Sequence, residues 1–133
     1  MKIRSATLED EAAIVALWQA CGLTVPYNDP AQDFRFALGK ANSNILVFDD
    51  LSGSVMVGHD GHRGWLYYVS VAPDRRLKGL GHALVLAAEQ WLSQRGIRKV
   101  QLMVRETNHA VTTFYQRPGY DPMPRINMQK WLT

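Results

Sequence analysis

Apolar residues recur along this chain with two spacings, and each spacing predicts one type of secondary structure. A spacing of three or four residues predicts four helices, which begin near positions 7, 29, 79 and 108. Alternating or continuous apolar runs predict six strands, at residues 2–6, 44–48, 54–58, 65–71, 97–104 and 126–132. The resulting order, β-α-α-β-β-β-α-β-α-β, predicts a mixed sheet of the α/β or α+β class with strand 65–71 near its centre.

Polar residues mark the positions where three of these helices begin. Thr7 and Asp10 have the spacing of a capping box. Asp29 followed by Pro30 is typical of an N-cap and the first helical position. Asn108 is a good N-cap for the last helix, so we expect that helix to start there.

Length and composition narrow the classes of protein to which the chain can belong. A chain of 133 residues with 47% hydrophobic residues is expected to form one domain, residues 1–133. Its apolar runs are shorter than the ~20 residues that span a bilayer, and residues 1–5 lack the apolar stretch of a signal peptide. The net charge is +3, but the sequence has no tract of basic residues and no motif that would contact nucleic-acid bases. We therefore expect neither nucleic-acid nor membrane binding. The single cysteine, Cys21, agrees with a reducing cytoplasm, where we expect a monomer or a homodimer.

Residues 69–84 join an apolar strand to a helix through a basic turn with two glycines. The turn has the pattern R-x-x-G-x-G, with Arg76, Gly79 and Gly81 at the fixed positions. Unpaired amides and the helix dipole favour an anion at a helix start, and glycines allow the backbone to approach phosphates. The pattern is neither a P-loop nor a full dinucleotide fingerprint, because Leu84 stands where the third glycine would be. The turn predicts a pyrophosphate site, with a simple basic helix entry as the alternative.

A second motif follows the predicted strand 97–104. It begins at Asn108, includes Phe114-Tyr115 and ends at Gly119-Tyr120. Tyr115 lies seven residues after Asn108, so the two side chains share nearly one face of the predicted helix. An amphipathic helix with Tyr115 in the core is the alternative interpretation of this motif taken alone.

Together and in this order, the two motifs resemble the signature of the GNAT superfamily of acetyl-CoA-dependent N-acetyltransferases over residues 69–120. The first half of the chain, at Leu17-Trp18, Cys21 and the runs 26–30 and 60–68, is similar to the small bacterial YpeA-type branch. The resemblance implies a GNAT-like acyl-CoA N-acyltransferase fold. It also implies direct attack of a primary amine on acetyl-CoA in a ternary complex, with a small amine or a protein or peptide amine as acceptor.

The resemblance implies a role for each motif position. Backbone amides of Val69, Ser70 and Val71, on a strand with a bulge, would pair with pantetheine and polarise the acetyl carbonyl. Asn108 would contact the pantetheine arm. Tyr115 would donate a proton to the departing CoA thiolate, because a phenol stays protonated at neutral pH. The residues that would hold the pyrophosphate are Arg76, Leu77, Lys78, Gly79, Leu80, Gly81 and His82.

The reaction also needs a proton acceptor, because an alkylammonium has a pKa near ~10.4. Glu106 is our candidate for this base, and Asp60 and His62 at the tip of a predicted hairpin are further candidates. A surface position for Glu106 and a turn role for Asp60 are the alternatives. His59, Asp60 and His62 match no zinc signature, so we expect no metal site.

We expect the first helices and the loops that face Tyr115 to form the acceptor site. The candidate lining residues are Trp18, Tyr27, Asn28 and Tyr67. Core packing is the alternative for Trp18 and Tyr67, whereas Tyr27 and Asn28 lie in a predicted loop, where function concentrates.

Two positions depart from the family pattern. The β-carbon of Leu77 would oppose a left-handed turn, so we expect an altered phosphate loop there. Pro118 should end the last helix early and place Tyr115 near its end. Because the sequence does not identify the base, a CoA-binding sensor or interaction module with weak catalysis is the alternative function.

Overall fold

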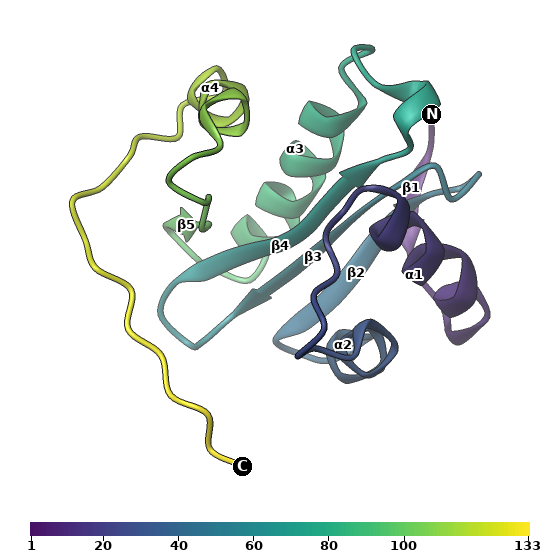
Figure 1. Cartoon of the computed structure of the whole chain (residues 1–133), viewed down its shortest axis with the longest axis horizontal. Helices are drawn as coiled ribbons and strands as arrows, with labels where there is room; N and C mark the ends of the chain where they lie inside the picture. The colour runs from purple at the N-terminus through teal and green to yellow at the C-terminus, as the bar shows by residue number, and fades with distance from the viewer. The chain divides into compact units, whose positions relative to one another are not determined.

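Five strands form one mixed sheet in the order β1-β2-β3-β4-β5 (Figure 1). The strands are β1 (Ile3–Ser5), β2 (Ser43–Phe48), β3 (Gly53–His59), β4 (Gly64–Val71) and β5 (Val100–Gln101). The first four pair antiparallel, and β4 pairs parallel with β5. The predicted mixed α/β class is confirmed, although β3 is the middle strand and β4 lies between β3 and β5.

The computed structural model describes all residues from 1 to 133, which fall into two units, Met1–Leu102 and Met103–Thr133. The first unit contains the whole sheet and most of the helices. Its helical segments are η1 (Leu8–Asp10), α1 (Glu11–Ala20), α2 (Pro30–Ala37), η2 (Pro73–Arg75) and α3 (Leu80–Ser93). The second unit contains α4 (His109–Gln116). No helix is both long and apolar enough to cross a membrane.

The sheet of the first unit has helices on both faces, with α1 and α2 on one and α3 on the other (Figure 1). Trp18 of α1 and Phe34 of α2 are fully buried against β2 on the first face. Leu84 and Leu92 of α3 are buried on the second face. There α3 lies so close to the sheet that a Cβ at Gly64 would be 2.5 Å from a Leu92 methyl group. Glycine at this position therefore permits the close packing of α3.

The polar residues at the helix starts act as the sequence predicts. The amide of Thr7 donates to Asp10 Oδ2 over 2.9 Å, as in a capping box. Asp29 Oδ1 accepts from the amide of Ala31 over 3.0 Å, with Pro30 at the first helical position. Each cap satisfies an amide that a helix start would otherwise leave unpaired.

Two strand predictions at the C-terminal end are wrong. The predicted strand 97–104 is reduced to Val100–Gln101, and the residues on either side have no ladder partner. The predicted strand 126–132 is absent, and Ile126 and Leu132 are 90% and 89% exposed. Alternation alone does not make a strand, because the ladder hydrogen bonds and the burial of one face require a neighbouring strand.

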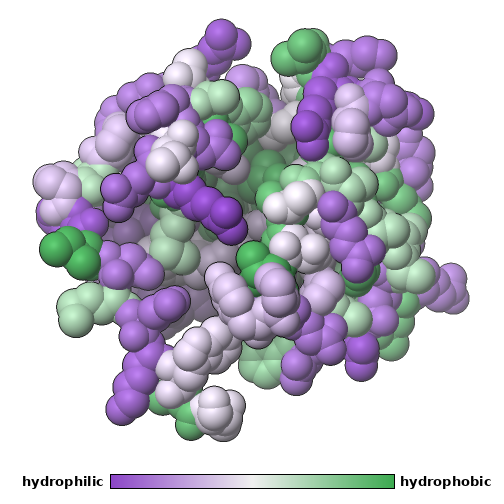
Figure 2. Space-filling view, viewed as in Figure 1, coloured by the Kyte–Doolittle hydropathy of each residue, from purple (hydrophilic) through white to green (hydrophobic).

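The surface of the protein contains both hydrophilic and hydrophobic residues. On the face shown in Figure 2, hydrophilic and hydrophobic residues are intermixed, and a few strongly hydrophobic residues lie at its edge. Leu77 and Ile126 are large apolar residues with exposed side chains.

Candidate active site

A β-bulge interrupts the pairing of β3 and β4. Ser54 pairs with Ser70 and Met56 pairs with Tyr67, so Tyr68 and Val69 together lie opposite Val55. Tyr68 has a φ of 50°, in the left-handed region. A bulge leaves backbone groups outside the ladder and redirects the side chains beside it. The bulge that the family resemblance implies is therefore present, within the predicted stretch of β4.

The bulge turns Tyr68 toward α1 and α2. Its ring stacks on that of Trp18 with the centroids 3.9 Å apart and the planes at 12°. Its hydroxyl donates to Asp33 Oδ2 of α2 over 2.8 Å. Burial, together with the hydrogen bond to Asp33, raises the pKa of Tyr68, so the phenol stays protonated at neutral pH. These contacts hold a backbone conformation that a residue with a β-carbon seldom adopts.

A buried chain of hydrogen bonds supports the bulge from below. Trp18 Nε1 donates to Ser54 Oγ over 2.9 Å, and the Oγ atoms of Ser54 and Ser70 are 2.8 Å apart. All three side chains are buried, and no exposed area of Trp18 remains. Trp18 therefore supports Tyr68 and the bulge from the core. Trp18 was a candidate for lining the acceptor site, but it has no exposed area and packs in the core, which was the alternative interpretation. No local pattern pointed to Asp33, the partner of Tyr68.

The basic turn connects β4 to α3 through two left-handed residues. Leu77 has a φ of 67° and Gly79, the N-cap of α3, has a φ of 75°. Leu77 thus adopts the left-handed conformation that its β-carbon was expected to exclude. Its fully exposed side chain meets no neighbouring residue, so only the local strain between the β-carbon and its own backbone remains.

The start of α3 has the features of an anion site. Its N-cap residue, Gly79, makes no side-chain hydrogen bond to the helix amides, and its first turn contains no acidic residue. A Cβ at Gly79 would meet nothing within 4 Å, so the space in front of the turn is open. Arg76 Nε donates to the carbonyl of Val71 over 3.1 Å, while Lys78 is exposed. Open amides, a favourable helix dipole and basic side chains are what a diphosphate requires.

A hollow of about 330 Å³ lies between α2 and the hairpin of β3 and β4. Tyr67, which is 42% exposed, lines it, as do Trp65 of β4 and Phe36 of α2. Because of the bulge, the consecutive residues Tyr67 and Tyr68 both face the side of the sheet that carries α1 and α2. The other two acceptor candidates, Tyr27 and Asn28, are exposed in the loop before α2 and do not line this hollow.

Asp60 closes the hairpin between β3 and β4. Its Oδ1 accepts from the amides of Arg63 and His62 over 2.7 and 2.9 Å. These hydrogen bonds, that from Arg63 above all, lower the pKa of Asp60, which makes its carboxylate a weaker base. The amide of Gly61 donates to His59 Nδ1 over 3.1 Å, and no group of three or more His, Cys, Asp or Glu residues converges on a metal position.

The second unit contains the remaining predicted site residues. Asn108 caps α4, with its Oδ1 accepting from the amide of Val111 over 3.3 Å. Glu106 is exposed in the turn before it. Tyr115 lies in the last turn of α4, edge-on to Phe114 and Tyr120, and α4 ends before Pro118 as expected. Burial raises the pKa of Tyr115 to about 12.

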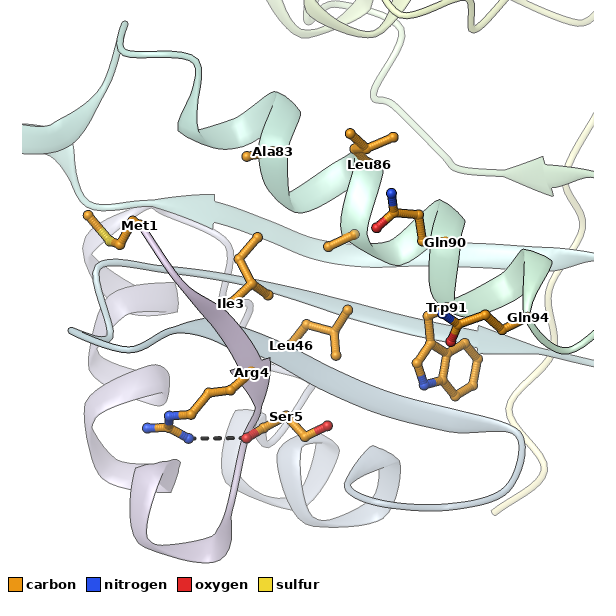
Figure 3. Close-up of a pocket in the computed structure, with 11 residues that line it drawn as sticks. Met1, Ile3, Arg4, Ser5, Leu46, Ala83, Leu86, Gln90, Trp91 and Gln94 are labelled. Atoms are coloured by element: carbon orange, nitrogen blue, oxygen red, sulfur yellow. Dashed lines mark hydrogen bonds between the residues drawn. The ribbon is translucent and has the colours of Figure 1, made fainter.

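A larger hollow of about 500 Å³ lies on the opposite side of the sheet, between α3 and the edge strand β1 (Figure 3). Ile3, Leu46, Leu86 and Trp91 contribute apolar surface to it. Its one charged residue, Arg4, is already bound to Asp10 over 2.8 Å and to Asp49 over 3.1 Å. None of the predicted site residues lines this hollow, so its size alone does not make it the candidate site.

Comparison with known proteins links this geometry to one family. Residues 8–120 match the sequence model of the Acetyltransferase (GNAT) family. An acetyltransferase of Pectobacterium atrosepticum is 40% identical over 99% of this chain and 96% of its own length. The solved structure of AAC(6')-Iy with the bisubstrate analogue CoA-S-monomethyl-acetylneamine has a TM-score of 0.81 at 16% identity, covering 99% of this chain and 98% of that one. An aminoglycoside acetyltransferase from an uncultured soil metagenomic sample, in complex with sisomicin, has a TM-score of 0.77 at 14% identity, covering 99% and 95%.

Proposed function

Because the chain belongs to the GNAT acetyltransferase family, we propose that it transfers the acetyl group of acetyl-CoA to a primary amine by direct attack in a ternary complex. One observation carries the proposal. The backbone bulge of β4 and the uncapped start of α3 are joined by a single short segment, residues 72–79. The bulge supplies donors for a carbonyl oxygen and the helix start supplies donors for a diphosphate, and acetyl-CoA contains both groups.

The turn before α3 fits the diphosphate of acetyl-CoA. We propose that the amides of residues 77–82 and the side chains of Arg76 and Lys78 bind it. The open space in front of Gly79 and the absence of a carboxylate in the first turn support this assignment. When bound, acetyl-CoA supplies an activated thioester, and the chain's own residues position and polarise it.

The strand end after the bulge is the proposed site of carbonyl polarisation. Amides of Val69, Ser70 and Val71 would donate to the acetyl oxygen and the pantetheine arm. Ser70 is buried and its hydroxyl lies 2.8 Å from that of Ser54, so this part of the backbone is held rigidly. Donors fixed in advance stabilise the negative charge that develops on the oxygen without reorganisation.

The reaction also requires two proton transfers, one from the amine and one to the thiolate. The amine loses a proton, its nitrogen forms the amide bond, the carbon–sulfur bond breaks, and the thiolate takes up a proton. We propose that Tyr115 donates this last proton and that Glu106, exposed to solvent, receives the proton of the amine. The ordinary pKa of a thiol, about 8.5, is lower than that of Tyr115, so these values alone oppose transfer of a proton from the phenol to the thiolate. Burial beside Tyr115 would also raise the pKa of the thiol, which reduces the difference.

Asn108 is the proposed contact to the pantetheine arm. Its Oδ1 is occupied in capping α4, which leaves its amide nitrogen as a donor. A pantetheine carbonyl is a suitable acceptor for that donor.

Replacing Tyr115 with Phe tests the acid. We expect kcat to fall roughly tenfold or more while the Kd for acetyl-CoA stays unchanged, because the variant loses only the donated proton. Since the pKa of Tyr115 is about 12, wild-type activity should rise as the amine deprotonates and should show no descending limb from Tyr115 below about pH 11. Steady-state thiol release across pH measures both effects.

Tyr120→Phe is the matched control, because it removes a neighbouring hydroxyl and keeps the ring that packs edge-on against Tyr115. Equal activities of wild type, Tyr115→Phe and Tyr120→Phe would remove the acid assignment. Binding of acetyl-CoA without release on any amine would instead favour the CoA-binding sensor.

A further inference from the structure

Asp33 is a half-buried carboxylate that has a hydrogen-bond donor but no cation. Tyr68 donates to its Oδ2 over 2.8 Å, and none of the ion pairs in the structure includes it. The partly buried carboxylate of Glu11 on the neighbouring helix α1, by contrast, is paired with Arg35 over 2.8 Å. Oδ1 of Asp33 therefore remains available to a ligand.

Asp33 contacts the bulge directly and lies on the same helix as residues that line the hollow, although it is not itself part of the lining. Tyr68, its donor, directly precedes Val69, where the acetyl carbonyl is proposed to bind. Phe36 and Ala37 follow Asp33 at intervals of three and four residues, so they lie on the same side of α2, and both line the hollow. Lys40, beyond the end of α2, also lines it. A molecule in the hollow can thus extend toward Asp33 and the bulge.

The walls of the hollow are mainly apolar and aromatic. They include Phe36, Met56, Trp65 and Tyr67. The ammonium of Lys40 lies 3.4 Å from the centre of the Phe36 ring, which adds one positive charge. The carboxylate that lines the hollow, that of Asp60, already accepts two hairpin amides. A polycation would meet Lys40 and too few free carboxylates, whereas a single ammonium on an apolar body matches both the charge and the lining.

We propose that Asp33 binds the ammonium of the acceptor and that the acceptor is a primary amine on an apolar or aromatic body, which lies in the hollow between α2 and the β3–β4 hairpin. This inference rests on the proposed acetyl transfer and names its acceptor class. Asp33 Oδ1 accepts from the ammonium, and Tyr68 holds the other oxygen in place. The ammonium then releases one proton to bulk water, and the neutral amine attacks the thioester. Its second proton goes to Glu106, the C–S bond breaks, and the thiolate takes a proton from Tyr115, as proposed above.

The test compares Asp33→Asn with wild type, using 2-phenylethylamine as the probe and spermine as the polycation. Calorimetry should detect binding of 2-phenylethylamine to the wild type, in the presence of CoA, and a roughly ten- to hundredfold weaker affinity for Asp33→Asn. The value of kcat/KM for this amine should fall by a similar factor, mainly through KM, while the Kd for acetyl-CoA is unchanged. Glu9→Gln, which neutralises an exposed carboxylate elsewhere, is the control and should match the wild type.

Three results would overturn the inference. Wild type could fail to bind 2-phenylethylamine, Asp33→Asn could bind and acetylate it as well as wild type does, or spermine could be the better ligand and substrate. Tyr68→Phe, which keeps the carboxylate and the ring, should retain most of the affinity and shows whether a loss in Asp33→Asn reflects charge or folding. Binding of the amine that depends on Asp33, without any acetyl transfer, would uphold the ammonium site and contradict the proposed function.

Discussion

Tyr68 and Leu77 both adopt a left-handed backbone conformation, one before and one after the end of β4, yet their surroundings are opposite. Tyr68, at a φ of 50°, is held by a stacked tryptophan and a hydrogen bond to Asp33. Leu77, at a φ of 67°, is fully exposed. Each carries a cost of about 1–2 kcal/mol relative to an ordinary conformation. Tertiary contacts therefore offset the strain at the bulge, whereas no packing of the Leu77 side chain offsets the strain in the turn.

The same substitution should therefore have opposite effects at the two positions. Tyr68→Gly should lower the free energy of unfolding by about 2–4 kcal/mol, because the lost ring packing exceeds the strain that glycine relieves. Urea-induced unfolding, followed by circular dichroism, measures the change. Unaltered or increased stability would show that the stack on Trp18 does not hold the bulge.

Removing only the hydroxyl separates the ring from the hydrogen bond. Tyr68→Phe keeps the stack on Trp18 but leaves Asp33 without its donor, so we expect a loss of about 1 kcal/mol. The same urea titration applies, and the m-value should stay constant if the unfolding remains two-state. A loss of stability as large as that of Tyr68→Gly would contradict the expectation that the ring contributes more to stability than the hydroxyl does.

The smallest effect is expected in the turn. Leu77→Gly should raise the free energy of unfolding by about 0.5 kcal/mol, because relief of the left-handed strain slightly exceeds the extra entropy of glycine in the unfolded chain. Leu77→Asn, which also tolerates this conformation, should give a smaller gain in the same direction. A clear loss of stability in both variants would mean that the exposed leucine makes a stabilising contact.

Local signals in the sequence predicted much of this molecule. Asp29-Pro30 and Asn108 begin their helices as expected, and α3 starts directly after Gly79. Such features depend on backbone chemistry within a few residues, which a single sequence contains.

Features that depend on distant partners could not be predicted in the same way. Asp33 meets Tyr68 across 35 positions of the sequence, and neither residue has a local pattern that indicates the other. The alternation at residues 126–132 predicts a strand, but pairing requires a neighbour that the local pattern does not specify. The bulge was expected from the family resemblance, whereas its left-handed tyrosine was not.

The most direct test of the central claim is a calorimetric titration of the wild-type protein with acetyl-CoA, followed by amine-dependent thiol release. We expect micromolar binding, CoA release that requires a primary amine, and a binding enthalpy that Lys78→Glu reduces together with the affinity. Absence of acetyl-CoA binding would contradict the assignment of the β4 bulge and the α3 turn as the site of acetyl transfer.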